Sequence, residues 1–149
     1  MIPVTQTKVV IKNSKDEIVV HGNCYAAAIA SILELPLTEV PNVEVFFHLP
    51  IDSTYWSEVM LTFLESKGYE LCVDDRFRVF HDGNFGVDNG MRAHWLLECE
   101  NKYYLVSGRS KRGFSHMVIY KNGKLAHDPH PSRDGVETID YIQTLMKAK

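Results

Sequence analysis

Cys24, His116 and Asp128 are the residues of this chain whose types and surroundings predict nucleophilic chemistry. Cys24 follows Gly22 and Asn23 and precedes an apolar segment rich in alanine, so we expect it in the first turn of a buried helix. The positive end of a helix dipole favours the thiolate, which makes this a suitable place for a nucleophilic cysteine. A free cysteine is also a common small core residue, and that alternative stays open for Cys24 on this segment alone.

His116 is the candidate base. It lies near the start of an apolar strand that ends in the pair Asn122-Gly123, and this pair is a strong signal for a hairpin turn. The returning strand ends at Asp128, so the hairpin should bring that carboxylate back to His116, to within about one residue of register. A thiol, an imidazole and a carboxylate form the nucleophile, base and orienting group of nucleophilic catalysis.

Other interpretations of these residues remain. His116 can be an ordinary histidine at a sheet edge, and Asp128 can cap the turn before Pro129. Imidazole and carboxylate also suit zinc or iron. The ligands of such a metal site would be His127, Asp128 and His130. No second cluster completes a coordination shell and no two cysteines form a C-x-x-C pair, so we expect no metal and no cofactor.

The composition predicts a single globular domain over residues 1–149. Hydrophobic residues make up 45% of the chain, charged residues 23%, and the net charge is −3, which gives no basic surface for nucleic acid. No apolar run approaches the roughly 18 residues of a membrane span, and the N-terminus does not resemble a signal peptide. The three cysteines are Cys24, Cys72 and Cys99. Their odd number and wide spacing favour a reducing, cytoplasmic location.

The elements that must position the site begin with a predicted hairpin over residues 8–20. A helix should then run from Cys24 to about Glu34, with Asn23 as its N-cap, because an asparagine side chain can accept a free N–H of the first turn. The state of residues 43–49 is left open.

A second helix should start at a Ser53 or Thr54 cap and end before Gly68. Its apolar stripe consists of Trp56, Val59, Met60, Phe63 and Leu64. We assign Trp56 and Met60 to core packing, since most such stripes are core. Trp56 is also kept, with Arg109 and Arg112, as a candidate for contact with a substrate or ligand.

Strands dominate the rest of the chain. They are expected at residues 69–73, 91–98, 102–107, 114–120 and 125–128, with a long loop at 74–90 as a further candidate for substrate contact. The spacing of Ile139, Ile142, Leu145 and Met146 predicts a C-terminal helix. The fold class predicted is α+β, with N-terminal helices packed on an antiparallel sheet.

Two segments resemble papain-like cysteine peptidases. Gly22-Asn23-Cys24 before the alanine-rich helix resembles the catalytic opening of that superfamily. Residues 113–120 and 127–132 resemble the histidine and acid segments of its bacteriocin-processing (double-glycine leader) branch, small members of which occur in bacteria and phages. The similarity runs in order over nearly the whole chain. It implies a papain-like fold with Cys24 as nucleophile, His116 as base and Asp128 as orienting residue.

The oxyanion hole departs from the pattern of those families, which place a glutamine a few residues before the cysteine. Gln6 is the only glutamine upstream of Cys24 here, and it can fill the role if the hairpin at 8–20 is an insertion that loops out and returns. The alternative is that Gln6 is an N-terminal surface residue. Asn23 and His21 are the other candidate donors.

The expected function is that of a cysteine peptidase or related amide hydrolase that forms a thioester with Cys24. A deamidase or acyltransferase would share the first step, and the substrate would be a peptide, a protein or a small molecule. The alternative is a papain-fold binding protein without turnover, which sequesters a small anionic ligand or a host protein through the basic loop at 109–112. That loop can also be merely solvated. A purely structural role is the third possibility.

Overall fold

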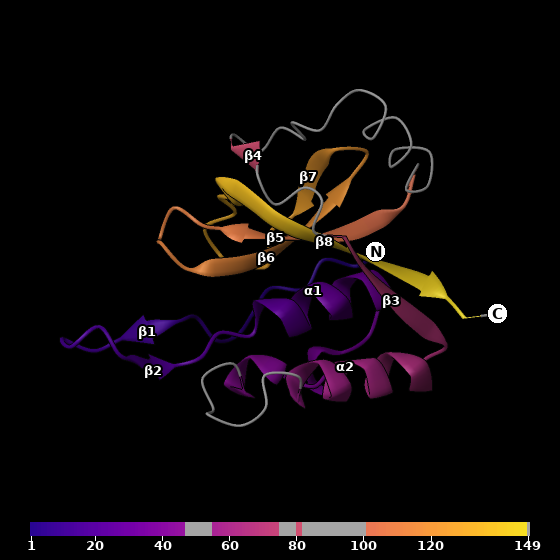
Figure 1. Ribbon diagram of the computed structural model, residues 1–149, viewed down its shortest axis with the longest axis horizontal. Coiled ribbons are helices and arrows are strands. Elements are labelled where there is room, and N and C mark those ends of the chain that lie inside the picture. The colour runs from indigo at the N-terminus through magenta and orange to yellow at the C-terminus, as the bar shows by residue number, and fades with distance from the viewer. Residues whose placement is uncertain (47–54, 75–79, 82–100, 149) are drawn as a thin grey trace.

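The protein is an α+β protein in the computed structural model. The structure describes residues 1–46, 55–74, 80–81 and 101–148. The helices in these ranges are α1 (Cys24–Leu33), α2 (Tyr55–Ser66) and the 3-10 helices η1 (Leu37–Glu39) and η2 (Val43–Phe46). Figure 1 shows α1 in the middle of the molecule, between a large sheet and α2. The α+β class expected from the sequence is confirmed.

The large sheet is antiparallel and has the strand order β3-β8-β5-β6-β7, with β4 also paired to β8. Its strands are β3 (Tyr69–Asp74), β4 (Phe80–His81), β5 (Tyr103–Arg109), β6 (Ser115–Lys121), β7 (Lys124–His127) and β8 (Thr138–Lys147). A separate hairpin of β1 (Ile11–Lys12) and β2 (Ile18–Val20) projects from one end of the molecule (Figure 1). The predicted hairpin at 8–20 is therefore confirmed.

The C-terminal segment is a strand, and the helix predicted there is wrong. Ile139 and Ile142 are both buried, and residues three apart lie on one face of a helix. In β8, however, the pairing with β5 shifts between Ser107 and Gly108, so Gly108 opposes Ile139 while Val106 opposes Ile142. This bulge adds one residue to β8 and brings both isoleucines to the same face of the sheet. The bulge thus gives this strand a spacing of apolar residues that is normally typical of a helix, which explains the wrong prediction.

Gly108 permits the close approach of β5 and β8. A Cβ atom at this position would lie 1.7 Å from the carbonyl oxygen of Thr138. Gly108 also pairs with His116 across β5 and β6. The close contact between β5 and β8 at Gly108 therefore supports the strand next to His116, and any side chain at residue 108 would prevent it.

The hairpin of β6 and β7 forms as the sequence predicts. Asn122 and Gly123 have φ values of 52° and 79°, the positive pair that a two-residue hairpin turn of type I′ requires. His127 pairs with Ile119, so Asp128 follows directly after the last paired residue of β7. Asp128 therefore approaches His116 diagonally across the two strands.

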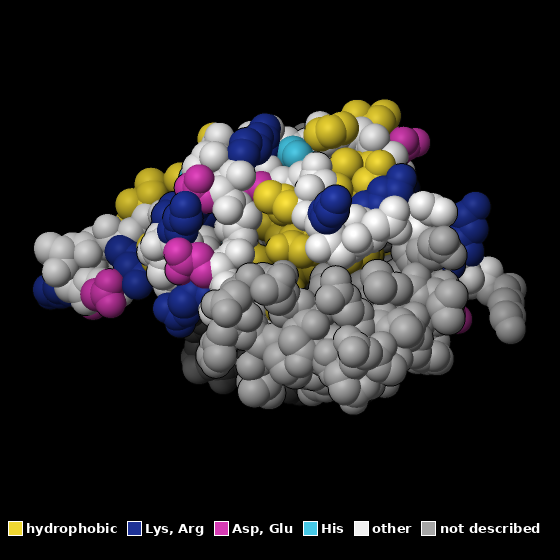
Figure 2. Space-filling model, turned by 90° about the horizontal axis from the view of Figure 1, so that it is seen from above, with side chains coloured by type: hydrophobic (Ala, Val, Ile, Leu, Met, Phe, Trp, Pro, Cys, Tyr) yellow, Lys and Arg dark blue, Asp and Glu magenta, His cyan; other side chains and the backbone are white. Residues whose placement is uncertain are grey.

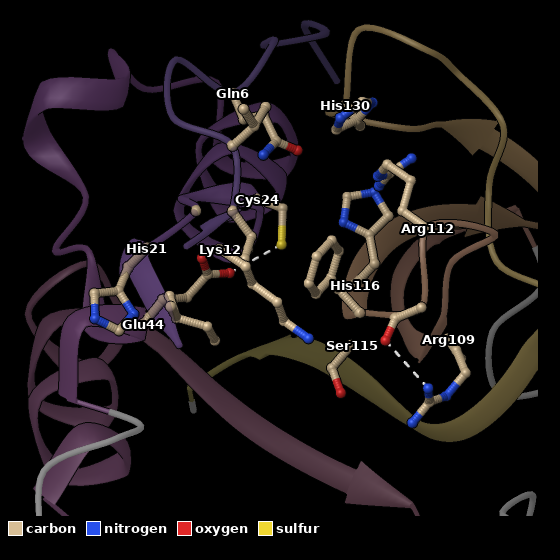
Figure 3. Close-up of a pocket in the computed structure, with 16 residues that line it drawn as sticks. Gln6, Lys12, His21, Cys24, Glu44, Arg109, Arg112, Ser115, His116 and His130 are labelled. Carbon is tan, nitrogen blue, oxygen red and sulfur yellow. Dashed lines mark hydrogen bonds between the residues drawn. The ribbon is translucent and has the colours of Figure 1, made fainter. Parts of the chain in front are cut away.

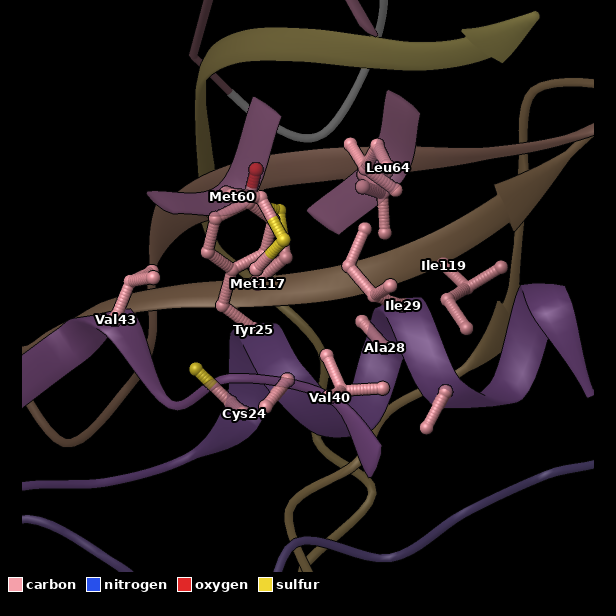
Figure 4. Close-up of a cluster of buried hydrophobic side chains, with 13 residues drawn as sticks. Cys24, Tyr25, Ala28, Ile29, Val40, Val43, Met60, Leu64, Met117 and Ile119 are labelled. Atoms are coloured by element: carbon pink, nitrogen blue, oxygen red, sulfur yellow. The ribbon is translucent and has the colours of Figure 1, made fainter. Parts of the chain in front are cut away.

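The core is built around α1. All side chains of this helix from Cys24 to Ser31 are buried. Figure 4 shows the helix packed against Met117 and Ile119 of β6, with Met60 and Leu64 of α2 in the same cluster. Small alanine side chains let the sheet and α2 approach the helix closely, and each fully buried leucine or isoleucine stabilises the fold by about 1.5–3 kcal/mol. This packing fixes the position of the helix N-terminus.

Some predicted segments lie outside the described residues. These are the helix cap at Ser53 or Thr54, the strand at 91–98 and all of the loop at 74–90 except residues 74 and 80–81. The end of the second helix is described, and Gly68 follows it with a φ of 83°, as expected for a C-terminal glycine.

Candidate active site

Cys24 is the first residue of α1 and is 6% exposed. Its thiol borders a cavity of about 420 Å³ that lies between the hairpin of β1 and β2, the N-terminus of α1 and the start of β6. His116 lines the same cavity (Figure 3). A second cavity, of about 260 Å³, also reaches both residues and includes Trp56. Cys24 therefore borders both cavities, although it is also part of the buried cluster around α1.

The N-terminus of α1 is capped differently from the prediction. The side-chain oxygen of Asn23 accepts hydrogen bonds from the backbone N–H groups of Thr7 and Lys8, at 3.0 and 2.9 Å, and makes no cap bond to the helix. Glu44, from η2, caps the helix instead. Its Oε1 atom accepts the backbone N–H of Tyr25 at 3.2 Å. The side-chain nitrogen of Asn23 donates to Thr7 Oγ1 at 2.9 Å, so Asn23 joins the N-terminal segment to α1. The role of Asn23 as oxyanion donor stays a prediction.

Glu44 also holds the thiol of Cys24. The Sγ atom donates a hydrogen bond to Glu44 Oε1 at 2.9 Å. Burial, followed by the charge of Glu44 and this hydrogen bond, raises the pKa of Cys24 well above its ordinary value, whereas a backbone hydrogen bond from Met117 works in the opposite direction. The sequence predicts a lowered pKa at a helix N-terminus, but the neighbouring carboxylate and desolvation outweigh the helix dipole.

His116 and Asp128 form a short buried hydrogen bond. Nε2 of His116 lies 2.6 Å from Asp128 Oδ1, and both side chains are almost fully buried. Asp128 also accepts the backbone N–H groups of His130 and Gly135, each at 2.8 Å. Burial on its own would raise the pKa of Asp128, but the hydrogen bonds from His116 and from the backbone outweigh it, and the pKa lies below its ordinary value.

The orientation of the His116 ring suits a base. Because Nε2 bonds to Asp128, the remaining ring nitrogen, Nδ1, is available for a proton from another group. Figure 3 shows a ring nitrogen of His116 on the side of the cavity where the thiol of Cys24 lies. Within the described part of the chain, the thiol of Cys24 donates its hydrogen bond to Glu44 and makes no hydrogen bond to His116. The structure thus brings the three predicted residues together but leaves the thiol bound to a fourth.

Gln6 is buried beside Cys24 and is not a surface residue. It is 7% exposed and lines the cavity, and its backbone N–H donates to Pro129. Its side-chain Nε2 donates to the carbonyl oxygen of Lys8 at 2.7 Å, while its Oε1 has no hydrogen-bond partner among the residues that the structure describes. Turning the amide over would place two acceptors against each other, so this contact fixes its orientation. The oxyanion role of Gln6 stays a prediction.

The wall of the cavity across from Glu44, here called the basic wall, carries two arginines. Arg109 and Arg112 line it, and their guanidinium groups donate to the carbonyl oxygen of Gly113 and to Ser132 Oγ. Burial and the positive charge of Arg112 lower the pKa of His130 on the same wall. Lys12, on the hairpin, lies 4.8 Å from the ring centroid of Phe114 and so connects the hairpin to this wall. Figure 2 shows one face of the molecule, on which basic, acidic and histidine side chains surround a hydrophobic area.

Trp56 belongs to the smaller cavity and to the core. Its ring packs edge-on against Tyr25, with the centroids 6.2 Å apart. No three histidine, cysteine or acidic side chains come together to hold a metal in the residues that the structure describes. The same residues contain no helix long and apolar enough to cross a membrane.

Comparisons of the chain with models of known protein families, with curated proteins and with solved structures find no match.

Glu44 is the site residue that the sequence does not reveal. It lies in a short segment, residues 43–46, without clear helix or strand periodicity. A single glutamate in such a segment is usually on the surface, yet this one is 9% exposed and contacts the candidate nucleophile. No local signal identifies it, because its position depends on how η2 packs against α1.

Proposed function

We propose that this protein is a papain-like thiol hydrolase that transfers the acyl group of a peptide or another amide to Cys24 and then to water. The observation that carries the proposal is one cavity bordered by a helix N-terminal thiol and by an imidazole whose far nitrogen bonds to a buried carboxylate. The placement of Cys24 on α1 and of His116 on an antiparallel strand packed against that helix also fits the papain-like fold implied by the resemblance.

In the proposed reaction, Nδ1 of His116 accepts the proton of the Cys24 thiol while the sulfur attacks the substrate carbonyl. The backbone N–H of Cys24, at the helix N-terminus, faces the developing oxyanion. The protonated His116 then gives its proton to the leaving amine as the C–N bond breaks. Water attacks the thioester with His116 as base, which releases the carboxylic acid and restores the thiol. Asp128 keeps the imidazole in the tautomer that has Nδ1 free.

This reaction requires the thiol to leave Glu44. The resting thiol is protonated and hydrogen-bonded to Glu44, so general-base catalysis at the moment of attack fits this site better than a preformed thiolate. Because the chemistry needs a reduced thiol, a reducing location such as the cytoplasm belongs to the proposal.

A second candidate function is binding without turnover. The raised pKa of Cys24 and the engagement of the Gln6 amide nitrogen with Lys8 favour it, because each opposes a step of acyl transfer. The basic wall at Arg109 and Arg112 would then hold a small anionic ligand or an acidic surface of a host protein.

Acylation by p-nitrophenyl acetate distinguishes the two functions. The ester transfers its acetyl group to a thiol and releases p-nitrophenolate, and peptide mass spectrometry identifies the acetylated cysteine. We expect Cys24, although buried, to be acetylated faster than the exposed Cys72. His116→Ala should slow the acetylation of Cys24 by about 10²–10⁴-fold, the usual contribution of a general base.

The matched control is His130→Ala, which removes an imidazole from the same cavity but leaves the contact between His116 and Asp128. Its ring lies 6.1 Å from that of His116, centroid to centroid, and we expect a much smaller effect. Acetylation of Cys24 no faster than that of Cys72, or equally fast with and without His116, would rule out the hydrolase and leave the binding function.

A further inference from the structure

The wall of the cavity formed by Gln6 and Glu44, here called the acceptor wall, presents hydrogen-bond acceptors next to Cys24. Glu44 contributes a carboxylate that is 9% exposed. Gln6 contributes Oε1, which is buried and has no hydrogen-bond partner within the described ranges of the chain. Figure 3 shows Glu44 on the far side of Cys24 from His116, and the amide oxygen of Gln6 directed at the space between Cys24 and His130. An unpartnered buried acceptor is costly, so it indicates a group that arrives with the ligand.

The two residues of the acceptor wall are held close to each other around Gly22. A Cβ atom on Gly22 would lie 3.2 Å from Glu44 Oε2 and 3.5 Å from the carbonyl oxygen of Lys8. That carbonyl oxygen is also the acceptor for Gln6 Nε2, at 2.7 Å. The absence of a side chain at residue 22 therefore lets the carboxylate and the amide share one side of the cavity.

We propose that the acceptor wall binds a positively charged N–H donor of the substrate, an ammonium or guanidinium group a few bonds away from the reacting carbonyl. This proposal rests on the proposed function, because it assigns a substrate class to the same site. A cation satisfies both observations, since it supplies a charge opposite to that of Glu44 and the donor that Gln6 Oε1 lacks.

The basic wall favours one orientation of the bound substrate. Arg109, Arg112 and His130 lie across the cavity from Glu44, on the side of His116 (Figure 3). The guanidinium groups of Arg109 and Arg112 repel a cation, which favours the acceptor wall as the place for the charged group. The acyl carbon of such a substrate then lies between the thiol and the imidazole.

Binding of a cation would also activate the nucleophile. Glu44 opposes ionisation of Cys24 through its charge and its hydrogen bond. A substrate ammonium that pairs with Glu44 neutralises that charge and competes for the same oxygen atoms, which frees the thiol for His116. Recognition and activation would thus occur through one residue.

Three p-nitrophenyl esters with the same two-carbon spacer test the proposal. The β-alanine ester carries an ammonium group, the butyrate ester a methyl group and the succinate monoester a carboxylate. In each reaction the sulfur–acyl bond forms, the ester C–O bond breaks and p-nitrophenolate leaves. Rates at Cys24 are divided by those of N-acetylcysteine, which removes the intrinsic reactivity of each ester. We expect the normalised rate to be at least tenfold higher for the ammonium ester than for the methyl ester, and lowest for the carboxylate ester.

Glu44→Gln should reduce the preference for the ammonium ester to less than about twofold. The substitution changes the ionisation of Cys24 in the free protein equally for both esters, so the ratio of their rates reports only what the bound ammonium group does. Gln6→Leu should reduce the preference by a smaller factor, about threefold, because it removes an acceptor but no charge. Glu39→Gln is the matched control, because it makes the same charge change at an exposed site paired with Lys67.

The outcomes separate this inference from the proposed function. Acylation that depends on His116 but shows no preference for the ammonium ester, or a preference that survives Glu44→Gln, overturns the inference and leaves the hydrolase. If no ester acylates Cys24, binding is measured directly by NMR titration of the Cys24→Ala variant with β-alaninamide and with succinamate. Stronger binding of the amine that is lost with Glu44→Gln supports the inference, and equal binding of the two compounds overturns it.

Discussion

The two halves of the candidate site are built in different ways. The base half consists of His116 and Asp128, which come from one hairpin. Nε2 of His116 lies 2.6 Å from Asp128 Oδ1, and Asp128 also accepts two backbone N–H groups. The nucleophile half, Cys24, is surrounded by residues from separate segments, with Glu44 from η2 and Gln6 from the N-terminal segment. The imidazole is thus oriented by a carboxylate of its own hairpin, while the surroundings of the thiol oppose its ionisation.

This difference shows that a helix N-terminus does not by itself activate a cysteine. Cys24 occupies the position where the helix dipole favours a thiolate, yet burial and the carboxylate of Glu44 raise its pKa. The local backbone decides where the thiol lies, and the residues packed over it decide its protonation. Variants of the base half should therefore change the rate of acylation and the stability of the fold, whereas variants of the nucleophile half should change the protonation of Cys24.

The largest effect is expected from Asp128→Asn in the base half. The variant lets the imidazole adopt the tautomer that has a proton on Nδ1, which cannot accept the proton of Cys24. Acetylation of Cys24 should fall by about 10²–10⁴-fold, as for other orienting carboxylates. Asp134→Asn, on the exposed part of the same loop, is the control and should leave the rate within about twofold. An Asp128→Asn rate close to that of the native chain would contradict the role of Asp128.

The second effect compares a glycine in each half. Gly108→Ala places a Cβ atom 1.7 Å from the carbonyl oxygen of Thr138, so the backbone of β5 or β8 must move. We expect a loss of about 2–4 kcal/mol in the free energy of unfolding, measured by urea denaturation. Gly22→Ala meets its nearest atom, Glu44 Oε2, at 3.2 Å, and that side chain can shift. Its loss should be below about 1 kcal/mol. Equal losses would show that the base half is no more rigid than the nucleophile half.

The third effect concerns the protonation of the nucleophile. Glu44→Gln removes the negative charge beside Cys24, so the pKa of the thiol should fall toward its ordinary value. Alkylation of Cys24 by iodoacetamide at pH 7 should become about tenfold faster, and the pH at which the rate is half-maximal should decrease. Glu39→Gln serves again as the distant control. An unchanged pH profile would mean that burial alone holds the thiol protonated.

The smallest effect is the acid sensitivity of the base half. Hydrogen bonds from His116 and the backbone outweigh burial and lower the pKa of Asp128. A lowered folded-state pKa stabilises the fold above the unfolded pKa of about 3.9, and this contribution is lost as the pH falls through the folded-state value. The native chain should therefore exceed Asp128→Asn by about 1–2 kcal/mol at pH 7, and the gap should narrow below pH 4 in urea titrations. A gap independent of pH would contradict the lowered pKa.

Local signals in the sequence were sufficient for the base half. The pair Asn122-Gly123 has the backbone preference of a tight hairpin turn, and that turn brings Asp128 to His116. The alanine-rich segment was likewise sufficient for α1 and for Cys24 at its start. These features depend on neighbours in the chain, where turn geometry and helix propensity act over a few residues.

Features that depend on distant neighbours were predicted wrongly or missed. The C-terminal helix proved to be β8, because a bulge opposite Ser107 and Gly108 puts residues three apart on one face of the sheet. Asn23 was expected to cap α1, but its oxygen binds the N-terminal segment and Glu44 takes the cap.

The sequence by itself thus determined the candidates for nucleophile, base and orienting group, and the hairpin that joins the last two. Only the tertiary structure decided the state of the nucleophile, because the pKa of Cys24 depends on its burial and on a carboxylate twenty residues away that packing brings to 2.9 Å. Turns and helices arise from interactions between near neighbours. Desolvation and the field of a buried charge arise only when remote segments pack together.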